Sequence, residues 1–333
     1  MSKVYTNPSS YSKIQIIRYS EVRMNIHNIL IAGEYQREFE TLFPNRKQRK
    51  FRFLPVEEIK EQDLDWADAY VGFKPCPNFQ LSKLKWVHSF NAGVNNYLDL
   101  PGWKENQVIL TRTICSFGER ISEYCLSFIL KDLQHHSQFQ NQQQRKKWIQ
   151  STPKMLKDIT IMIFGTGAIG QEVARTFTHF GSTVIGISES GKQKDSFHQI
   201  VPIGSASSLI GEVDWIISTL PLTQNTNKLF TEEYFSRMKS VGFINVGRGA
   251  TVDEKALIGA LDSGNIHTAI LDVVEVEPLP EHSTLWQRKE VVITPHISAV
   301  TELNEAIDCF AQTLHALETN QPLPNQVNFD KGY

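Results

Sequence analysis

The glycine-rich turn that begins at Gly165 constrains the fold of this chain more than any other feature. An apolar run ending at Phe164 leads into the turn, and a helical pattern follows to Phe177. In this context the first glycine allows a tight turn, the second lets the backbone approach a pyrophosphate, and the third lets the helix pack on its strand. The helix N-terminus offers unpaired N–H groups to phosphates. The residues predicted to bind a dinucleotide here are Gly165, Gly167, Ala168, Ile169 and Gly170.

The end of the next predicted strand bears on which dinucleotide is bound. An acid about twenty residues after the glycine turn usually binds the ribose 2′-hydroxyl of NAD. Here Ser188 stands at that position and Glu189 follows one place later. Glu189 would repel a 2′-phosphate, so the pattern favours NAD(H) slightly over NADP(H). The neighbouring side chains able to cradle a 2′-phosphate are Ser188, Ser190, Lys192 and Lys194.

Composition excludes several classes of function. The net charge of −2 and the pI near 6.6 leave no electrostatic footprint for nucleic acid or an anionic membrane. No apolar stretch is long enough to span a bilayer, and the N-terminus lacks the pattern of a signal peptide. The four cysteines lie far apart without metal-ligand spacing, which predicts no metal site and a reducing, cytoplasmic compartment. They are Cys76, Cys115, Cys125 and Cys309.

Three stretches near the C-terminal end combine into a predicted catalytic site. They are Asn245–Gly249, Leu271–Pro278 and Thr294–Ile297. They supply a fixed cation (Arg248), a carboxylate (Glu277) and an imidazole (His296), each at a strand end or in a loop downstream of the glycine turn. Taken alone, Arg248 has a simpler interpretation as a solvated cation and Glu277 as a surface acid. His296 has a simpler interpretation as a histidine whose ring nitrogens are hydrogen-bonded within the fold. Their joint occurrence in this order favours catalysis, with histidine able to transfer a proton near neutral pH.

The length and the alternation of elements predict two α/β domains. At 333 residues the chain is too long for one compact core. Short apolar runs alternate with helical patterns on both sides of a long helix expected from Gly118, so two Rossmann-like or flavodoxin-like domains with parallel sheets and a cleft between them are expected. We assign 1–23 to an N-terminal extension, with Met24 as a possible natural start. We assign 24–118 and 301–333 to a substrate domain, and 119–300 to a dinucleotide-binding domain.

With these motifs in place, the chain resembles the D-isomer-specific 2-hydroxyacid dehydrogenases over roughly residues 28 to 320. Besides the glycine turn and the three C-terminal stretches, the resemblance includes Asn91–Asn95, Gly118–Tyr124 and Leu220–Thr223. Within the family, Thr113–Tyr124 and Gly186–Ser188 most resemble the glyoxylate/hydroxypyruvate reductase A branch. That branch usually carries Arg where this chain has Glu189 and usually prefers NADPH, so the choice between NAD and NADP stays open.

The resemblance implies the interconversion of a small 2-oxo acid and a D-2-hydroxy acid by hydride transfer, with Arg248, Glu277 and His296 as the catalytic trio. His296 would be the acid in reduction and the base in oxidation. Glu277 would orient the imidazole and favour its protonated form. Arg248 would bind the substrate carboxylate and polarise the carbonyl with its fork of donors.

Further roles follow from the resemblance alone. The backbone N–H groups of Gly93 and Val94 would bind the other end of the substrate carboxylate, and Asp272 would lie beside the nicotinamide carboxamide. The other residues implied around the cofactor are Pro221, Thr223, Val246, Gly247 and Ser298. The family also implies a homodimer formed through the cofactor domain.

The sequence leaves open alternatives for the function and for the substrate. Formate dehydrogenases share the architecture, but they carry Gln where this chain has Glu277, which argues against that activity. An NAD(H)-sensing protein like the corepressors on the same fold is the alternative from another class. The substrate is not specified: Arg112 and Lys74 are candidates to bind a distal anion or to be solvated, and Trp86 is a candidate pocket wall or core aromatic.

Overall fold

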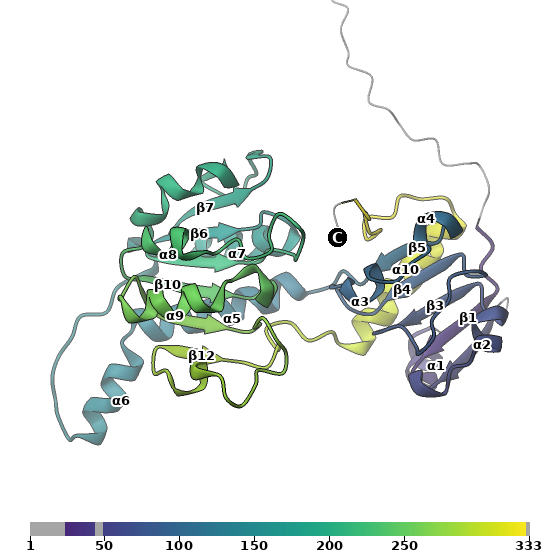
Figure 1. The fold of residues 1–333 in the computed structure, drawn as a ribbon, viewed down its shortest axis with the longest axis horizontal. Helices are drawn as coiled ribbons and strands as arrows, with labels where there is room; N and C mark the ends of the chain where they lie inside the picture. The colour runs from purple at the N-terminus through teal and green to yellow at the C-terminus, as the bar shows by residue number, and fades with distance from the viewer. Residues whose placement is uncertain (1–23, 44–48, 331–333) are drawn as a thin grey trace, which may run out of the picture.

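The computed structural model describes residues 24–43 and 49–330. The predicted N-terminal extension, 1–23, lies outside the described residues, as do 331–333 of the predicted substrate domain. The described chain forms two lobes, each built around a parallel β-sheet (Figure 1). This confirms the predicted α/β class with two parallel sheets, while the exact domain boundaries stay a prediction.

The first lobe contains a five-stranded sheet in the order β2-β1-β3-β4-β5, with every pair parallel. This is the flavodoxin-like strand order. The strands are β1 (Asn28–Ala32), β2 (Lys50–Leu54), β3 (Ala69–Gly72), β4 (Trp86–Ser89) and β5 (Ile109–Arg112). The helices are α1 (Gln36–Leu42), α2 (Glu61–Trp66), α3 (Asn95–Leu98) and α4 (Trp103–Asn106), with a 3₁₀ turn η1 (Val56–Glu58).

The helix α10 (Leu303–Glu318) returns to this first lobe from the far end of the sequence, as Figure 1 shows. Its apolar residues join one buried cluster with Ile29 and Ile31 of β1. Phe310 of α10 stacks on Trp86 of β4 with ring centroids 5.4 Å apart. The apolar residues of α10 recur at helical spacing along one stripe, and burying this stripe completes one face of the sheet.

The second lobe contains a seven-stranded sheet in the order β12-β11-β10-β9-β6-β7-β8. Strand order reverses between β6 and β9, which is the point where ligands bind in doubly wound sheets. The strands are β6 (Thr160–Phe164), β7 (Thr183–Ser188), β8 (Gln199–Pro202), β9 (Trp215–Ser218), β10 (Val241–Asn245), β11 (Ile266–Leu271) and β12 (Val291–Ile293).

Helices cover both faces of this second sheet. The main ones are α5 (Phe117–Leu133), α7 (Ala168–His179), α8 (Glu232–Ser236) and α9 (Glu254–Asp262), with 3₁₀ turns η2 (Leu156–Asp158), η3 (Ile203–Ser208), η4 (Ile210–Glu212), η5 (Gly249–Thr251) and η6 (Thr284–Gln287). Ile161 and Ile163 of β6 pack with α5 and α7, while Met162 and Phe164 pack with α8 and α9. A strand buried on both faces explains the continuous apolar run before the glycine turn.

The helix α5 leaves the first lobe and packs along α7 of the second, which agrees with the long helix expected from Gly118. Beyond it, α6 (His136–Gln144) projects from the second lobe (Figure 1) and has no buried residue. The polar composition of this stretch is typical of a solvated helix or arm. Trp148, a few residues after α6, is 96 % exposed.

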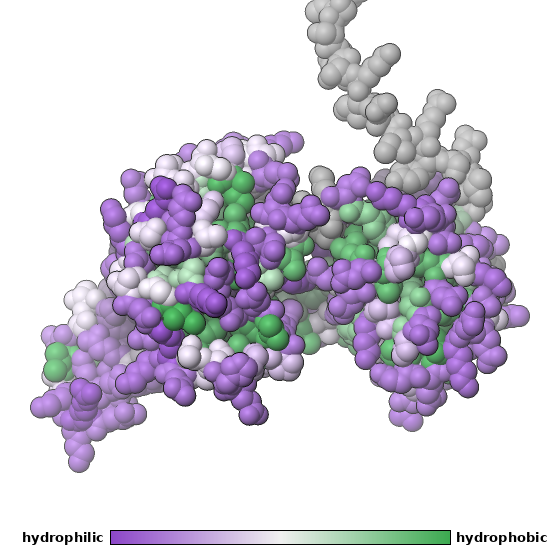
Figure 2. Space-filling view, in the orientation of Figure 1, coloured by the Kyte–Doolittle hydropathy of each residue, from purple (hydrophilic) through white to green (hydrophobic). Residues whose placement is uncertain are grey.

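The surface on the face shown in Figure 2 is mainly hydrophilic, and the two lobes are separated by a hollow. Within the described residues, no helix combines the length and the apolar character needed to cross a membrane. Groups of three or more side chains able to hold a metal ion are also absent from the part of the chain that the structure describes.

A glycine in the second sheet provides a test of the packing. Gly242 of β10 lies beside Trp215 of β9, and a Cβ on Gly242 would stand 2.5 Å from the indole ring. We therefore expect Gly242→Ala to lower the free energy of unfolding by about 1–3 kcal/mol through overpacking, measured by urea denaturation. Gly259→Ala is the matched control, because Gly259 lies in α9 with nothing within 4 Å of a Cβ, and this change should stabilise by about 0.5–1 kcal/mol. Equal stability of Gly242→Ala and the parent protein would contradict this packing.

Candidate active site

The glycine turn joins the carboxyl end of β6 to the start of α7, at the point where strand order reverses. Gly165 has a φ of +99°, a conformation that glycine adopts far more readily than other residues. A Cβ on Gly170 would stand 1.9 Å from the carbonyl oxygen of Gly165, so the first turn of α7 packs directly on the loop. A Cβ on Gly167 would meet nothing within 4 Å. Open space at this helix N-terminus fits the pyrophosphate of a dinucleotide.

The end of β7 lies beside the glycine turn. Ser188 is half-buried, and its hydroxyl accepts a hydrogen bond from the backbone N–H of Gly191 at 3.1 Å. Glu189 is exposed. Lys194 donates its ammonium to the carbonyl oxygen of Thr166 within the turn. A cation therefore stands against the glycine turn, which itself lies beside the strand end expected to meet the adenosine ribose.

Two further loops follow the strands on the other side of the switch point. After β9, Thr226 closes the loop by donating its hydroxyl to the carbonyl oxygen of Pro221 at 2.6 Å and accepting from the N–H of Thr223 at 2.8 Å. After β10, Val246 and Gly247 are buried, and the N–H of Gly247 donates to the side chain of Asn245 at 3.1 Å. The predicted cofactor residues of these loops thus lie at neighbouring strand ends; their contact with the cofactor stays a prediction.

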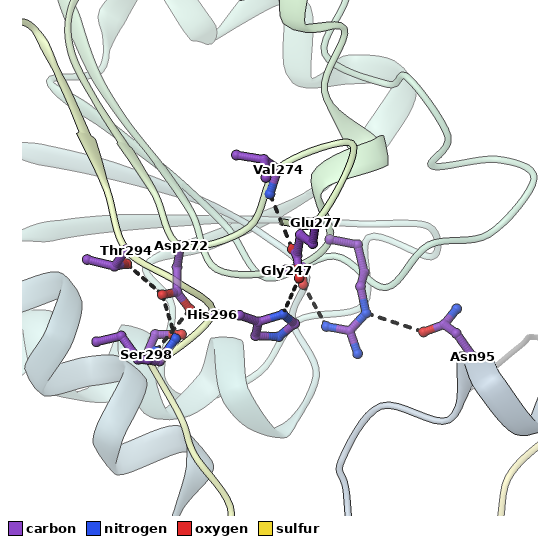
Figure 3. Close-up of polar contacts among 10 residues, drawn as sticks. Asn95, Gly247, Asp272, Val274, Glu277, Thr294, His296 and Ser298 are labelled. Atoms are coloured by element: carbon purple, nitrogen blue, oxygen red, sulfur yellow. Dashed lines mark hydrogen bonds and ion pairs between the residues drawn. The ribbon is translucent and has the colours of Figure 1, made fainter. Parts of the chain in front are cut away.

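Arg248 extends from the second lobe to the first. Its Nη1 donates to the carbonyl oxygen of Gly247 at 2.7 Å, and its Nε donates to Oδ1 of Asn95 at 3.3 Å (Figure 3). A Cβ on Gly93 would stand 2.0 Å from Nη2, so only glycine leaves room for the guanidinium here. The structure therefore brings the predicted cation against the loop whose N–H groups, at Gly93 and Val94, were predicted to bind a carboxylate.

The electrostatic surroundings of Arg248 are mixed. Burial lowers the pKa of its guanidinium, the carboxylate of Glu277 raises that pKa, and the charge of Arg112 lowers it. Because an arginine side chain stays protonated in proteins, the result is a desolvated fixed cation. Such a cation binds a carboxylate more strongly than one surrounded by water.

His296 and Glu277 form the second part of the trio. Nδ1 of His296 lies 2.9 Å from Oε2 of Glu277, and Oε1 of Glu277 accepts from the N–H of Val274 at 3.3 Å. Figure 3 shows Glu277 lying between Val274 and the imidazole. The side chains of His296 and Glu277 are 48 % and 40 % exposed, so both are accessible from solvent. With Nδ1 committed to Glu277, Nε2 is the nitrogen available for proton transfer.

Asp272 anchors the loop that carries His296. Its carboxylate is buried; Oδ1 accepts from the hydroxyl of Thr294 at 2.6 Å and the N–H of Ile297 at 2.8 Å, and Oδ2 accepts from the N–H of Ser298 at 2.9 Å (Figure 3). The N–H of His296 donates to the carbonyl oxygen of Asp272 at 2.9 Å. The structure thus gives Asp272 and Ser298 a role in shaping the loop, beyond the cofactor contacts that the resemblance implies.

The structure distinguishes among the candidates for substrate contact, Lys74, Trp86 and Arg112. Lys74 is exposed and pairs with Glu57 at 3.2 Å on the surface. Trp86 is fully buried in the core of the first lobe, so it is a core aromatic. Arg112, by contrast, lies beside the site, with Nη1 donating to the carbonyl oxygen of Ala92 at 3.1 Å. Asn95 accepts a hydrogen bond from Arg248, and Thr294 donates one to Asp272. No spacing in the sequence indicates these two contacts, although both residues belong to motifs noted above.

The cysteines show no sign of reactivity. Cys76, Cys125 and Cys309 are buried, Cys115 is half-buried, and all four are free. Burial is the main cause that raises the pKa of Cys115 to about 12, with the charge of Glu305 adding to it. A thiol that stays protonated is a poor nucleophile.

Comparison with known proteins adds independent findings. Residues 126–298 match the family model for the D-isomer specific 2-hydroxyacid dehydrogenase NAD-binding domain. Glyoxylate/hydroxypyruvate reductase A from Serratia proteamaculans (strain 568) is 32 % identical over 257 residues, covering 75 % of this chain and 82 % of that protein.

Two solved structures are similar across most of the chain. A D-isomer specific 2-hydroxyacid dehydrogenase from Xanthobacter autotrophicus Py2, in complex with NADPH and MES, matches with a TM-score of 0.83 and 26 % identity, covering 93 % of this chain and 100 % of that one. An NADPH-dependent glyoxylate/hydroxypyruvate reductase from Sinorhizobium meliloti, in complex with NADP and sulfate, matches with a TM-score of 0.80 and 27 % identity, covering 92 % and 100 %. With the family model, these matches show that the chain belongs to the D-isomer-specific 2-hydroxyacid dehydrogenase family of nicotinamide-dependent oxidoreductases.

Proposed function

We propose that this protein reduces a small 2-oxo acid of the glyoxylate or hydroxypyruvate type to the corresponding D-2-hydroxy acid, with His296 as the proton donor. The observation that carries the proposal is the 2.9 Å contact between Nδ1 of His296 and Glu277, in a site where Arg248 reaches the Gly93 loop of the other lobe. The names of the similar reductases from Serratia proteamaculans and Sinorhizobium meliloti support this substrate class.

Substrate binding is the role proposed for Arg248 and the Gly93 loop. The guanidinium, desolvated and held by Asn95, offers a fork of N–H donors to the C1 carboxylate and the C2 carbonyl oxygen. The backbone N–H groups of Gly93 and Val94 bind the carboxylate from the other side. Because these groups come from both lobes, the acid is held between them, and its carbonyl is polarised before reaction.

Proton transfer is the role proposed for His296 and Glu277. A nicotinamide cofactor supplies the hydride that adds to C2. As negative charge develops on the carbonyl oxygen, Nε2 of His296 donates a proton to it, and in oxidation the same nitrogen removes the proton. Glu277 fixes the tautomer and orientation of the ring through Nδ1 and stabilises the imidazolium. Asp272 holds the loop from behind.

For the cofactor, we infer that the site accepts NADP(H), which revises the slight preference for NAD(H) drawn from the sequence. Lys194 places a cation beside the glycine turn, and Ser188 adds a half-buried hydroxyl. Glu189 is exposed and can turn its carboxylate to solvent. The Xanthobacter and Sinorhizobium structures were solved with NADPH and NADP, which supports the same assignment.

We propose the roles of the two domains, the oligomeric state and the location from the family to which the chain belongs. Residues 24–118 with 301–333 would bind the acid, and 119–300 would bind the dinucleotide. We also propose a homodimer formed through the dinucleotide-binding lobe, and a cytoplasmic location that suits four free cysteines.

The activity is tested by the loss of NADPH and NADH absorbance with glyoxylate, hydroxypyruvate, pyruvate and phenylpyruvate. We expect turnover with the smaller acids. His296→Ala should lower kcat by on the order of a hundredfold or more while cofactor affinity is retained, because only proton transfer is removed. Glu277→Gln should cause a smaller loss, because the ring keeps a hydrogen-bonding partner.

Two outcomes would count against this function. Full turnover by His296→Ala would remove the proposed proton donor. Tight cofactor binding without turnover of any 2-oxo acid would favour the NAD(H)-sensing alternative.

The Gly93 loop provides a second test. Gly93→Ala should displace the guanidinium of Arg248, because the new Cβ would stand 2.0 Å from Nη2. We expect kcat/KM for the 2-oxo acid to fall by on the order of a hundredfold, since small displacements of positioning groups are costly. The Kd for NADPH, measured by fluorescence titration, should stay the same. Gly204→Ala, with nothing within 4 Å of a Cβ, is the matched control. Unchanged kcat/KM in Gly93→Ala would exclude the proposed role of the loop.

The cofactor assignment is tested at Lys194. Lys194→Met should raise KM for NADPH by on the order of tenfold or more, because a charge-assisted contact with the 2′-phosphate is lost. KM for NADH should change little, because NADH lacks that phosphate. Glu189→Gln should improve KM for NADPH by removing a repulsive charge. Lys255→Met, an exposed lysine of α9, is the control. A parallel loss for both cofactors in Lys194→Met would show that Lys194 supports the glycine turn instead.

A further inference from the structure

Arg112 carries a second guanidinium close to the site, and the proposed reaction does not use it. It is the last residue of β5, and its Nη1 donates to the carbonyl oxygen of Ala92, next to Gly93. Burial lowers the pKa of this guanidinium. Across residues 24–43 and 49–330, no carboxylate forms an ion pair with it. A desolvated cation without a counter-ion is unfavourable, so its surroundings favour an incoming anion.

The backbone at Arg112 is held firmly. Its N–H donates to the carbonyl oxygen of Asn325 at 3.1 Å, and its own carbonyl oxygen accepts from Nδ2 of Asn325 at 2.9 Å. Asn325 is buried and also donates to the hydroxyl of Thr313 in α10 at 2.7 Å. The guanidinium therefore stands on a rigid strand end. Of its five N–H donors, one has a described protein acceptor, which leaves the others for a ligand.

Arg112 and Arg248 approach the same loop from different lobes. Arg248 packs on Gly93, Arg112 bonds to Ala92, and the charge of Arg112 lowers the pKa of Arg248. Two like charges in a partly desolvated site repel each other, and an anion near both offsets that repulsion. The carboxylate of Glu277 already raises the pKa of Arg248, whereas none of the described carboxylates pairs with Arg112. A ligand with a second anionic group is therefore able to compensate Arg112 as well as Arg248.

We propose that Arg112 binds a second carboxylate of the substrate, so that the site is suited to 2-oxo dicarboxylic acids. Arg248 holds the C1 carboxylate and Arg112 holds the distal one. This inference rests on the proposed function. The redox step is unchanged: the reduced nicotinamide is oxidised as hydride adds to C2, the carbonyl π bond breaks, and His296 protonates the oxygen. The distal carboxylate is bound but not altered.

Oxaloacetate and pyruvate provide the test, because they differ only by the distal carboxylate. We expect kcat/KM for oxaloacetate to exceed that for pyruvate by on the order of tenfold or more. Arg112→Met should lower kcat/KM for oxaloacetate by on the order of 10- to 100-fold, with little change for pyruvate and glyoxylate. For Arg112→Lys, kcat/KM for oxaloacetate should lie between the values of the wild-type enzyme and Arg112→Met, because lysine keeps the positive charge but loses the planar fork of N–H donors. Arg237→Met, at the exposed arginine that directly follows α8, is the matched control.

Each result decides something different. Equal loss for oxaloacetate, pyruvate and glyoxylate in Arg112→Met would overturn the inference and make Arg112 a support for the loop. Glyoxylate turnover without preference for oxaloacetate over pyruvate would overturn the inference and leave the proposed function standing. No turnover of any 2-oxo acid would contradict the proposed function itself.

Inhibition of the wild-type enzyme gives a measurement that does not depend on the folding of Arg112→Met. Malonate should inhibit glyoxylate reduction more strongly than acetate does. Equal inhibition by the two acids would also overturn the inference.

Discussion

The buried carboxylate of Asp272 holds together the part of the structure on which the proposed chemistry depends. It is 2 % exposed and accepts three hydrogen bonds, from the hydroxyl of Thr294 and from two backbone N–H groups of the following loop. Tyr124 of α5 extends the network, with its hydroxyl 2.7 Å from that of Thr294. A buried anion satisfied in this way resists rearrangement, because any change leaves polar groups unpaired. His296 therefore keeps its backbone φ of +55°, which is uncommon for a residue with a side chain.

The second constraint is the division of the site between two parallel sheets. In each sheet the loops that carry polar groups follow the carboxyl ends of the strands, where doubly wound folds bind ligands. One sheet contributes Arg248, and the other contributes Gly93 and Asn95. The Arg248–Asn95 contact joins residues that are 153 positions apart in the sequence. Under the proposed function, a substrate held at this junction would be exposed to the desolvated charge of both lobes, which would strengthen its binding and orient its carbonyl group.

The sequence predicted the parts of this arrangement that depend on local pattern. An apolar run followed by Gly165 has few alternatives to a strand and a tight turn, and the apolar stripe of α10 requires a helix with one covered face. The contacts that depend on how the two lobes meet could not be predicted from the sequence. From sequence, Lys74 and Arg112 were equal candidates for binding a distal anion. Only the structure shows that Lys74 has a surface partner in Glu57, whereas Arg112 stands beside the Gly93 loop and pairs with no carboxylate among the described residues.

The return of α10 to the first lobe affects the order in which the chain is able to fold. The second lobe is continuous in sequence, so its sheet is available to form as soon as β12 has left the ribosome. One face of the first sheet, which α1 covers in part through Phe39, stays incompletely covered until Ile307, Phe310 and Leu314 of α10 emerge and pack on it. During synthesis the earlier lobe is therefore finished last, and its apolar strands are exposed while the later lobe is made. That interval is when chaperones would be most needed, because uncovered apolar strands promote aggregation.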